Sequence, residues 1–137
     1  MKQKEKTLSS QSRTHIDLLD QAFVKICEYY KVKASILRSD ARNRPIVFYR
    51  QCAMKFMYEQ IGMPLGICQT YISKRYFNRD HTTLIYSRQL LENYKETGDA
   101  YWDEYDSFCR YMIVNFPRIN NSIKPEDYPT LYPIINN

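Results

Sequence analysis

The stretch over residues 78–87 most constrains what this chain can fold into. Asp80 is a good helix N-cap, and helix-compatible residues follow it without Gly or Pro until Gly98. The stretch therefore predicts a helix that starts at Asp80 and runs to about Lys95. Free N–H groups in its first turn suit phosphate, and short polar side chains there suit base edges in a major groove. An ordinary capped helix starts in the same way, so both readings stay open from these residues alone.

Apolar residues recur at helical spacing through most of the remaining chain, which predicts an all-α helical bundle. A capping box at residues 14–17 predicts a first helix that ends near Tyr30. A break at Gly62-Met63-Pro64 precedes a helix over residues 65–77, which with the helix at Asp80 would form a helix-turn-helix. The other expected helices are a short one over 33–38, one from Pro45 to about Gln60, and an extra C-terminal one between Asp99 and Pro117.

Composition along the chain suggests three parts. Residues 1–13 are polar and without periodicity, so we expect a flexible tail. Residues 14–97 would form the helical domain, and residues 98–137 an extra helix followed by an acidic, Tyr- and Pro-rich tail. That tail would pack on the domain or trail from it, where it is available to another protein.

The positive charge is concentrated in one part of the chain. Residues 31–95 contain twelve Lys and Arg against four Asp and Glu, whereas residues 96–137 contain three against seven. A basic block of this kind is expected on a surface that faces a polyanion, although many solvated surfaces carry a similar excess.

Several classes of protein find no support in the sequence. The four Cys and two His do not form a zinc-binding spacing, and no nucleotide-binding Gly-rich motif occurs. The adjacent Asp80 and His81 point about 100° apart on a helix, so they would not act as an acid/base pair. No apolar run is long enough to span a membrane. We therefore expect no enzyme, no cofactor, no bound metal and no membrane partner, and a cytoplasmic, nucleoid-associated protein with free, buried cysteines.

Four segments, taken in order, resemble the C-terminal DNA-binding domain of DnaA, the bacterial chromosomal replication initiator. Glu28-Tyr29-Tyr30-Lys31-Val32-Lys33 resembles the end of that domain's first helix, and residues 39–44 fall where the family has a basic loop. Arg50-Gln51-Cys52-Ala53-Met54 resembles the family's Arg-Gln-x-Ala-Met segment, and Arg79-Asp80-His81-Thr82-Thr83 resembles the start of its recognition helix. The resemblance covers roughly residues 15–96.

The resemblance implies double-stranded DNA as the partner, and together with the helical geometry it suggests two sets of contacts. Arg42 would enter the minor groove, and Arg50 would hold a backbone phosphate. Tyr86 is added because it lies on the outer side of the second helical turn. The expected base contacts are Arg42, Asp80, His81, Thr82, Thr83 and Tyr86. The expected phosphate contacts are Arg44, Arg50, Gln51, Lys55, Ser73, Lys74, Arg75 and Arg79.

The direction in which some of these side chains point can also be predicted. Leu84, Ile85, Leu91 and Tyr94 should pack inward, whereas Gln51 and Lys55 should face away from the core. Arg50 falls in the apolar sector of its helix, so it needs an anionic partner, either a phosphate or an intramolecular Asp or Glu.

The sequence also departs from the family. Asp40 and Ala41 stand where the family's loop is usually basic, which should weaken phosphate binding by the loop. Phe77-Asn78 replaces the common Gly pair before the recognition helix, and the spacing from Arg50 to Asp80 is several residues longer than usual.

The function that these features indicate is that of a stand-alone, sequence-specific duplex-DNA-binding protein without the family's ATPase. Such a protein could bind replication-origin or regulatory boxes, regulate transcription, or serve a mobile element or phage. The alternative is a protein-interaction module that has kept the fold but lost base readout.

Overall fold

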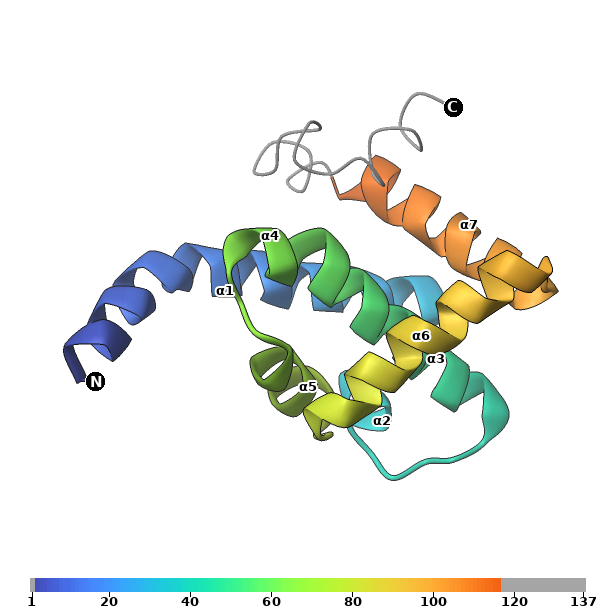
Figure 1. Ribbon diagram of the computed structural model, residues 1–137, viewed down its shortest axis with the longest axis horizontal. Coiled ribbons are helices and arrows are strands. Elements are labelled where there is room, and N and C mark those ends of the chain that lie inside the picture. The colour runs from blue at the N-terminus through green and yellow to red at the C-terminus, as the bar shows by residue number, and fades with distance from the viewer. Residues whose placement is uncertain (1, 117–137) are drawn as a thin grey trace.

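The structure, a computed structural model, describes residues 2–116 of the chain, with side chains from His15 onward. All regular secondary structure in this range is helical, which confirms the all-α class. Figure 1 shows α6 lying across α3, with α7 above this pair and α1 running behind the bundle.

Helix α1 spans Lys2–Tyr30 and therefore begins well before the expected cap. Residues 2–13, expected as a flexible tail, form its first turns, which extend beyond the other helices in Figure 1. These residues contain no Gly or Pro, so nothing in them terminates a helix. The helical spacing of its apolar residues gives α1 an inner side, on which Leu19, Phe23 and Ile26 are buried.

Helix α2 (Ala34–Leu37) and helix α3 (Arg44–Phe56) frame the loop that falls where the family has its basic loop. Pro45 lies in the first turn of α3, where its missing N–H removes no helical hydrogen bond. The inner side of α3 is buried at Ile46, Ala53 and Phe56.

The expected break at Gly62-Met63-Pro64 is wrong. The chain continues from α3 through a π-helical segment, η1 (Met57–Gly62), into α4 (Met63–Leu65). Pro64 lies in the first turn of α4, where proline is tolerated. The helix ends only at Gly66, whose φ of 78° is left-handed and costs glycine little.

The helix-turn-helix consists of α5 (Gln69–Phe77) and α6 (His81–Thr97), so α5 begins four residues later than expected. Asn78 adopts a left-handed φ of 54° in the turn, where the family commonly has glycine. Asn tolerates this conformation better than most residues, so the turn forms without glycine. The backbone N–H of Arg79 closes it by donating to the carbonyl of Ser73 at 3.0 Å.

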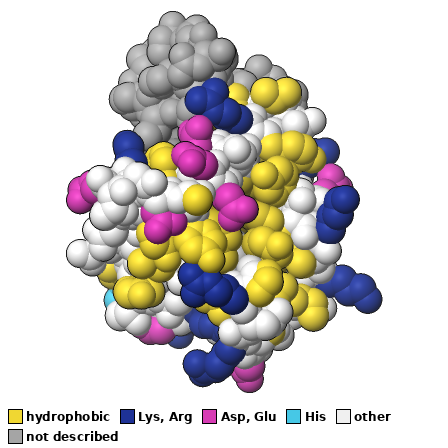
Figure 2. All heavy atoms as spheres, turned by 90° about the vertical axis from the view of Figure 1, so that its right-hand side faces the viewer, with side chains coloured by type: hydrophobic (Ala, Val, Ile, Leu, Met, Phe, Trp, Pro, Cys, Tyr) yellow, Lys and Arg dark blue, Asp and Glu magenta, His cyan; other side chains and the backbone are white. Residues whose placement is uncertain are grey.

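The extra C-terminal helix is confirmed as α7 (Ala100–Asn115), which Asp99 caps by accepting a hydrogen bond from the Tyr101 N–H at 2.8 Å. Gly98 ends α6 with a φ of 71°, as expected. Figure 2 shows hydrophobic side chains gathered on the face where α6 and α7 meet. Ring contacts of 5.4 Å between Tyr94 and Tyr101 and 4.8 Å between Phe48 and Tyr101 join α7 to α6 and α3. The tail expected after α7 lies outside the described residues.

Candidate nucleic-acid interface

The first turn of α6 is built around Asp80. Its Oδ2 atom accepts hydrogen bonds from the Thr82 backbone N–H at 3.0 Å and from the Thr82 hydroxyl at 2.7 Å. These two hydrogen bonds lower the pKa of Asp80 below its usual value, and the bond from the Thr82 hydroxyl has the larger effect. His81 Nδ1 lies 3.5 Å from the same carboxylate. Asp80 is therefore the N-cap, as expected, and it also orients the hydroxyl of Thr82.

The outer face of α6 presents mainly uncharged side chains near its N-terminus. His81, Thr82, Tyr86 and Gln89 are exposed, and Thr83 is half-buried. Ile85 was expected to pack inward, but this is wrong, because its side chain is 44% exposed. Leu84 and Leu91 provide the inner face, so Ile85 turns outward beside Tyr86. An exposed apolar group here suits contact with a thymine methyl.

Arg50 holds the loop between α2 and α3 from the inside. Its side chain is buried, and Nε donates to the Leu37 carbonyl at 2.9 Å. One terminal nitrogen donates to the carbonyls of Ser39 and Ala41, both at 3.2 Å. Of the two expected alternatives, a phosphate or an intramolecular Asp or Glu, the intramolecular ion pair is absent among the described residues, and backbone carbonyls accept from Arg50 instead.

Arg79 connects the helix-turn-helix to the same loop. One terminal nitrogen donates to the Ser39 carbonyl at 2.8 Å, and the other donates to the carbonyl of Phe77 at 3.1 Å. Burial lowers the pKa of Arg50, and the positive charges of Arg79 and Arg42 lower it further, while Asp40 acts in the opposite direction. The loop is thus surrounded by cations despite its own Asp40.

Arg42 is exposed at the outer side of this loop, in a position to contact a ligand. The loop is short and braced by Arg50 and Arg79, so Arg42 projects from a fixed backbone. A guanidinium held in this way suits the narrow, negative minor groove.

Helix α5 is attached to α1 by an ion pair. Two nitrogens of Arg75, Nε and Nη2, donate to the carboxylate of Asp20 at 3.0–3.2 Å, and Tyr76 also donates to Asp20. The Asp20 and Tyr76 hydrogen bonds raise the pKa of Arg75. Arg75 and Lys74 are both exposed, but Arg75 is already paired with an anionic side chain, that of Asp20.

Arg44 and Gln51 lie at the other side of α6. Arg44 is exposed and donates to the Tyr101 hydroxyl at 2.8 Å, with its guanidinium 5.0 Å from that ring's centre. Gln51 is half-buried and lines a hollow of about 190 Å³ that Arg44 and Tyr86 also line. These side chains lie beside the outer face of α6.

Besides Arg50, two further expected phosphate contacts are buried. Ser73 is fully buried in α5. Lys55 was expected to face away from the core, and this is wrong, because it is only 1% exposed and is paired with Glu59 and Glu92. The helical wheel could not show that carboxylates from η1 and α6 surround it.

Arg38 is a basic residue near the loop that the sequence did not single out. It is exposed and donates to the carbonyl of Arg75, which joins the end of α2 to α5. No local pattern marks this contact, because its partner lies 37 residues away.

The described residues were also expected to hold neither a metal site nor a membrane span. No three His, Cys, Asp or Glu side chains there are grouped to hold a metal ion. None of the described helices is long and apolar enough to cross a membrane. The four cysteines are free, and Cys52 and Cys109 are buried as expected, but Cys68 is exposed.

A capped helix with an exposed first turn, supported by a second helix and flanked by a braced loop that exposes Arg42, defines a helix-turn-helix DNA-binding domain. The chain belongs to the family described as bacterial dnaA protein helix-turn-helix, whose model matches residues 20–90. This confirms the resemblance found in the sequence.

Curated relatives agree with this assignment. The chain is 29% identical over 109 residues to the chromosomal replication initiator protein DnaA of Wolbachia pipientis wMel. It is 30% identical over 107 residues to the protein of the same name from Wolbachia sp. subsp. Brugia malayi (strain TRS). Each match covers 72% of this chain but only 22% of the relative. No solved structure matches the chain.

Proposed function

We propose that this chain binds double-stranded DNA in a sequence-specific manner, acting on its own and without nucleotide hydrolysis. The observation that carries the proposal is the pairing of the exposed first turns of α6 with a loop that both Arg50 and Arg79 brace. Base readout requires donors and acceptors held at fixed positions, and both parts of this surface are held by hydrogen bonds.

In the proposed complex, α6 enters the major groove with its N-terminus first. Thr82, His81 and Ile85 would reach base edges, with Tyr86 further along the groove wall. Thr83 and Asp80 would lie at the margin of this contact. The main role of Asp80 would be to cap α6.

Arg42 would enter the adjacent minor groove, since it is exposed on the braced loop. Lys74, Arg44 and Gln51 would contact phosphates on either side of α6. In the conformation described, Arg50, Arg79 and Arg75 support these contacts through intramolecular bonds, whereas Ser73 and Lys55 are too buried to contribute directly.

The relatives' name, chromosomal replication initiator protein, indicates the kind of DNA site that this chain would recognise. Binding to initiator boxes would place it in replication control, and binding to similar boxes elsewhere would regulate transcription, on a chromosome, phage or mobile element. DNA binding would associate the protein with the nucleoid. The 137 residues contain no Walker motif, so we propose no enzymatic role for them.

The test is a selection of preferred sites from random duplexes, followed by fluorescence anisotropy at two salt concentrations. We expect one motif to be recovered, to be lost with Thr82→Ala, and to be bound more weakly with Arg42→Ala. Thr97→Ala at the other end of α6 and Arg110→Ala in α7 are matched controls, which should bind as the wild type does. Absence of binding at low salt would contradict the proposal.

A second function, as a protein-interaction module, is favoured by Asp40 in the loop and by the acidic residues of α7. Charge reversal at Arg42 distinguishes the two functions. It should abolish DNA binding, whereas binding to a protein partner elsewhere on the bundle should persist.

A further inference from the structure

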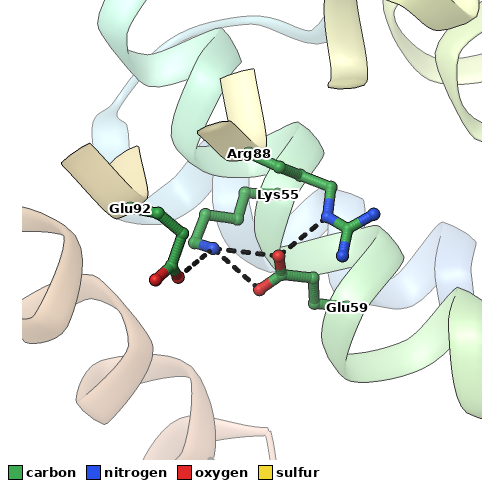
Figure 3. A network of polar contacts seen from close by, with 4 residues as sticks. All are labelled: Lys55, Glu59, Arg88 and Glu92. Carbon is green, nitrogen blue, oxygen red and sulfur yellow. Dashed lines mark hydrogen bonds and ion pairs between the residues drawn. The ribbon is translucent and has the colours of Figure 1, made fainter. Parts of the chain in front are cut away.

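Lys55 is a buried cation on α3, surrounded by two carboxylates from other elements. Its Nζ lies 2.9 Å from both carboxylate oxygens of Glu59 in η1 and 2.9 Å from one oxygen of Glu92 in α6. Nζ also lies 5.7 Å from the centre of the Tyr105 ring. Figure 3 shows the Lys55 ammonium between the two carboxylates.

A third ion pair joins α6 to η1, and its α6 residue lies one helical turn before Glu92. Arg88 Nε donates to the carboxylate of Glu59 at 2.8 Å, and its guanidinium lies 5.0 Å from the centre of the Tyr58 ring. Glu59 therefore accepts from both Lys55 and Arg88, as Figure 3 shows. We call Lys55, Glu59, Arg88 and Glu92 the ionic network.

The ionic network constrains α6 in a way that apolar packing does not. Hydrophobic contacts are non-directional, whereas charge-assisted hydrogen bonds require a narrow range of distances and angles. Arg88 and Glu92 attach α6 at two points one turn apart, which opposes both rotation about its axis and sliding along it. A buried ammonium without partners is strongly unfavourable, so Lys55 holds this arrangement.

The position of the outer face of α6, which is proposed to contact base edges, depends on this attachment, because a helix moves as a rigid rod over two turns. Side-chain tips lie roughly 5–6 Å from the helix axis, so a rotation of about 20° would move them by about 2 Å. A displacement of this size removes hydrogen bonds to base edges, whose useful range is only about 2.7–3.2 Å. Long, flexible Lys and Arg side chains can still reach phosphates after such a movement.

We propose that the ionic network positions α6 for base readout, so that Lys55 is a determinant of sequence selectivity although it does not contact DNA. The inference rests on the proposed function and deepens it. It also gives a role to Lys55, a cation that is buried although the proposed partner of the domain is a polyanion.

The first test is Lys55→Met, which removes the charge and keeps a side chain of similar length. Affinity for the selected duplex and for an unrelated duplex is measured over a range of salt concentrations. We expect about a tenfold loss on the selected duplex, little change on the unrelated one, and an unchanged dependence on salt. Lys74→Met is the matched comparison, since loss of a phosphate contact should weaken both duplexes and reduce the salt slope by about one.

A second variant guards against loss of folding in Lys55→Met. Glu92→Gln keeps the shape of a half-exposed side chain and removes one ion pair, so we expect a smaller loss of selectivity from a fully folded protein. Glu96→Gln, one turn further along α6, is its control and should behave as the wild type does. In a double-mutant cycle, Lys55→Met and Glu92→Gln should be coupled on the selected duplex and additive on the unrelated one.

The inference is overturned if the folded variants keep the selectivity of the wild type, or if they lose affinity equally on both duplexes. A shallower salt slope for Lys55→Met would also overturn it, since this would identify Lys55 as a phosphate contact. A wild-type protein without a preferred sequence would instead contradict the proposed function itself, so the two failures are distinguishable.

Discussion

Arg50 and Arg79 donate to the same backbone oxygen, the carbonyl of Ser39, at 3.2 Å and 2.8 Å. Arg50 comes from α3 and Arg79 from the turn before α6, so this single carbonyl connects the loop to the helix-turn-helix. The two guanidinium groups repel one another, and this repulsion contributes to the lowered pKa of Arg50. Two cations held close together around the loop increase its attraction for a phosphate backbone.

Replacement of Arg50 by Met should release the loop. The carbonyls of Leu37 and Ala41 lose their donor, and that of Ser39 keeps only Arg79, so we expect the free energy of unfolding to fall by about 2–3 kcal/mol. DNA affinity should also fall roughly tenfold under conditions where the variant is folded, because Arg42 is no longer held in place. Urea denaturation and anisotropy measure the two effects.

Arg110→Met is the control for this experiment, since Arg110 is exposed and makes one surface ion pair with Asp106. Its stability should change by less than about 1 kcal/mol. A folded Arg50→Met variant with wild-type DNA affinity would show that the bracing of the loop does not matter for binding.

The cap of α6 should make the stability of the domain depend on pH. The pKa of Asp80 is lowered in the folded protein, chiefly by the hydrogen bond from the Thr82 hydroxyl. The stabilisation is therefore present above the pKa of the unfolded chain and is lost as the pH falls through the lower pKa of the folded state. Asp80→Asn retains a good capping residue without a titratable group.

We expect the urea midpoint of Asp80→Asn to fall less than that of the wild type between pH 7 and pH 3. Asp103→Asn, an exposed residue in α7, is the comparison and should retain the wild-type pH dependence. An identical fall in Asp80→Asn and the wild type would contradict a titrating cap at α6.

Asn78 adopts a left-handed backbone conformation in the turn between α5 and α6. Its φ of 54° is more favourable for glycine, so Asn78→Gly should raise the free energy of unfolding by about 0.5–1 kcal/mol. Asn78→Ala should lower it by about 1 kcal/mol. Asn93→Gly, on the exposed side of α6, should be mildly destabilising, and equal effects at both positions would contradict the left-handed turn.

Gly62 allows η1 to approach α5 closely. A Cβ atom at this position would lie 2.6 Å from Cδ1 of Ile72 and 3.2 Å from the carbonyl oxygen of Ile67. Gly62→Ala should therefore lower the free energy of unfolding by about 1–2 kcal/mol. The double variant with Ile72→Val, which lacks that Cδ1 atom, should lose less than the sum of the two single variants, and strict additivity would argue against this contact.

The parts of the fold that depend on neighbouring residues could be predicted from the sequence. Asp80, Gly98 and Asp99 mark helix ends because caps and terminators act through hydrogen bonds and backbone conformations within one turn. The boundaries predicted around Gly62 and Pro64 failed because a proline in a first turn and a glycine in a helix are both permitted when packing supports them. The close packing of Gly62 against Ile72 supplies that support.

The candidate site divides in the same way. The sequence by itself determined that a capped helix with Thr82 in its first turn follows a supporting helix and a loop that carries Arg42, since these are local patterns in a fixed order. Only the tertiary structure decided that Arg50 braces the loop, that Ile85 is exposed and that Lys55 is buried between Glu59 and Glu92. A helical wheel gives the direction of a side chain relative to its own helix. Whether the side chain then meets solvent or a carboxylate depends on which other helix packs beside it. That packing is set by how all the helices together bury the core.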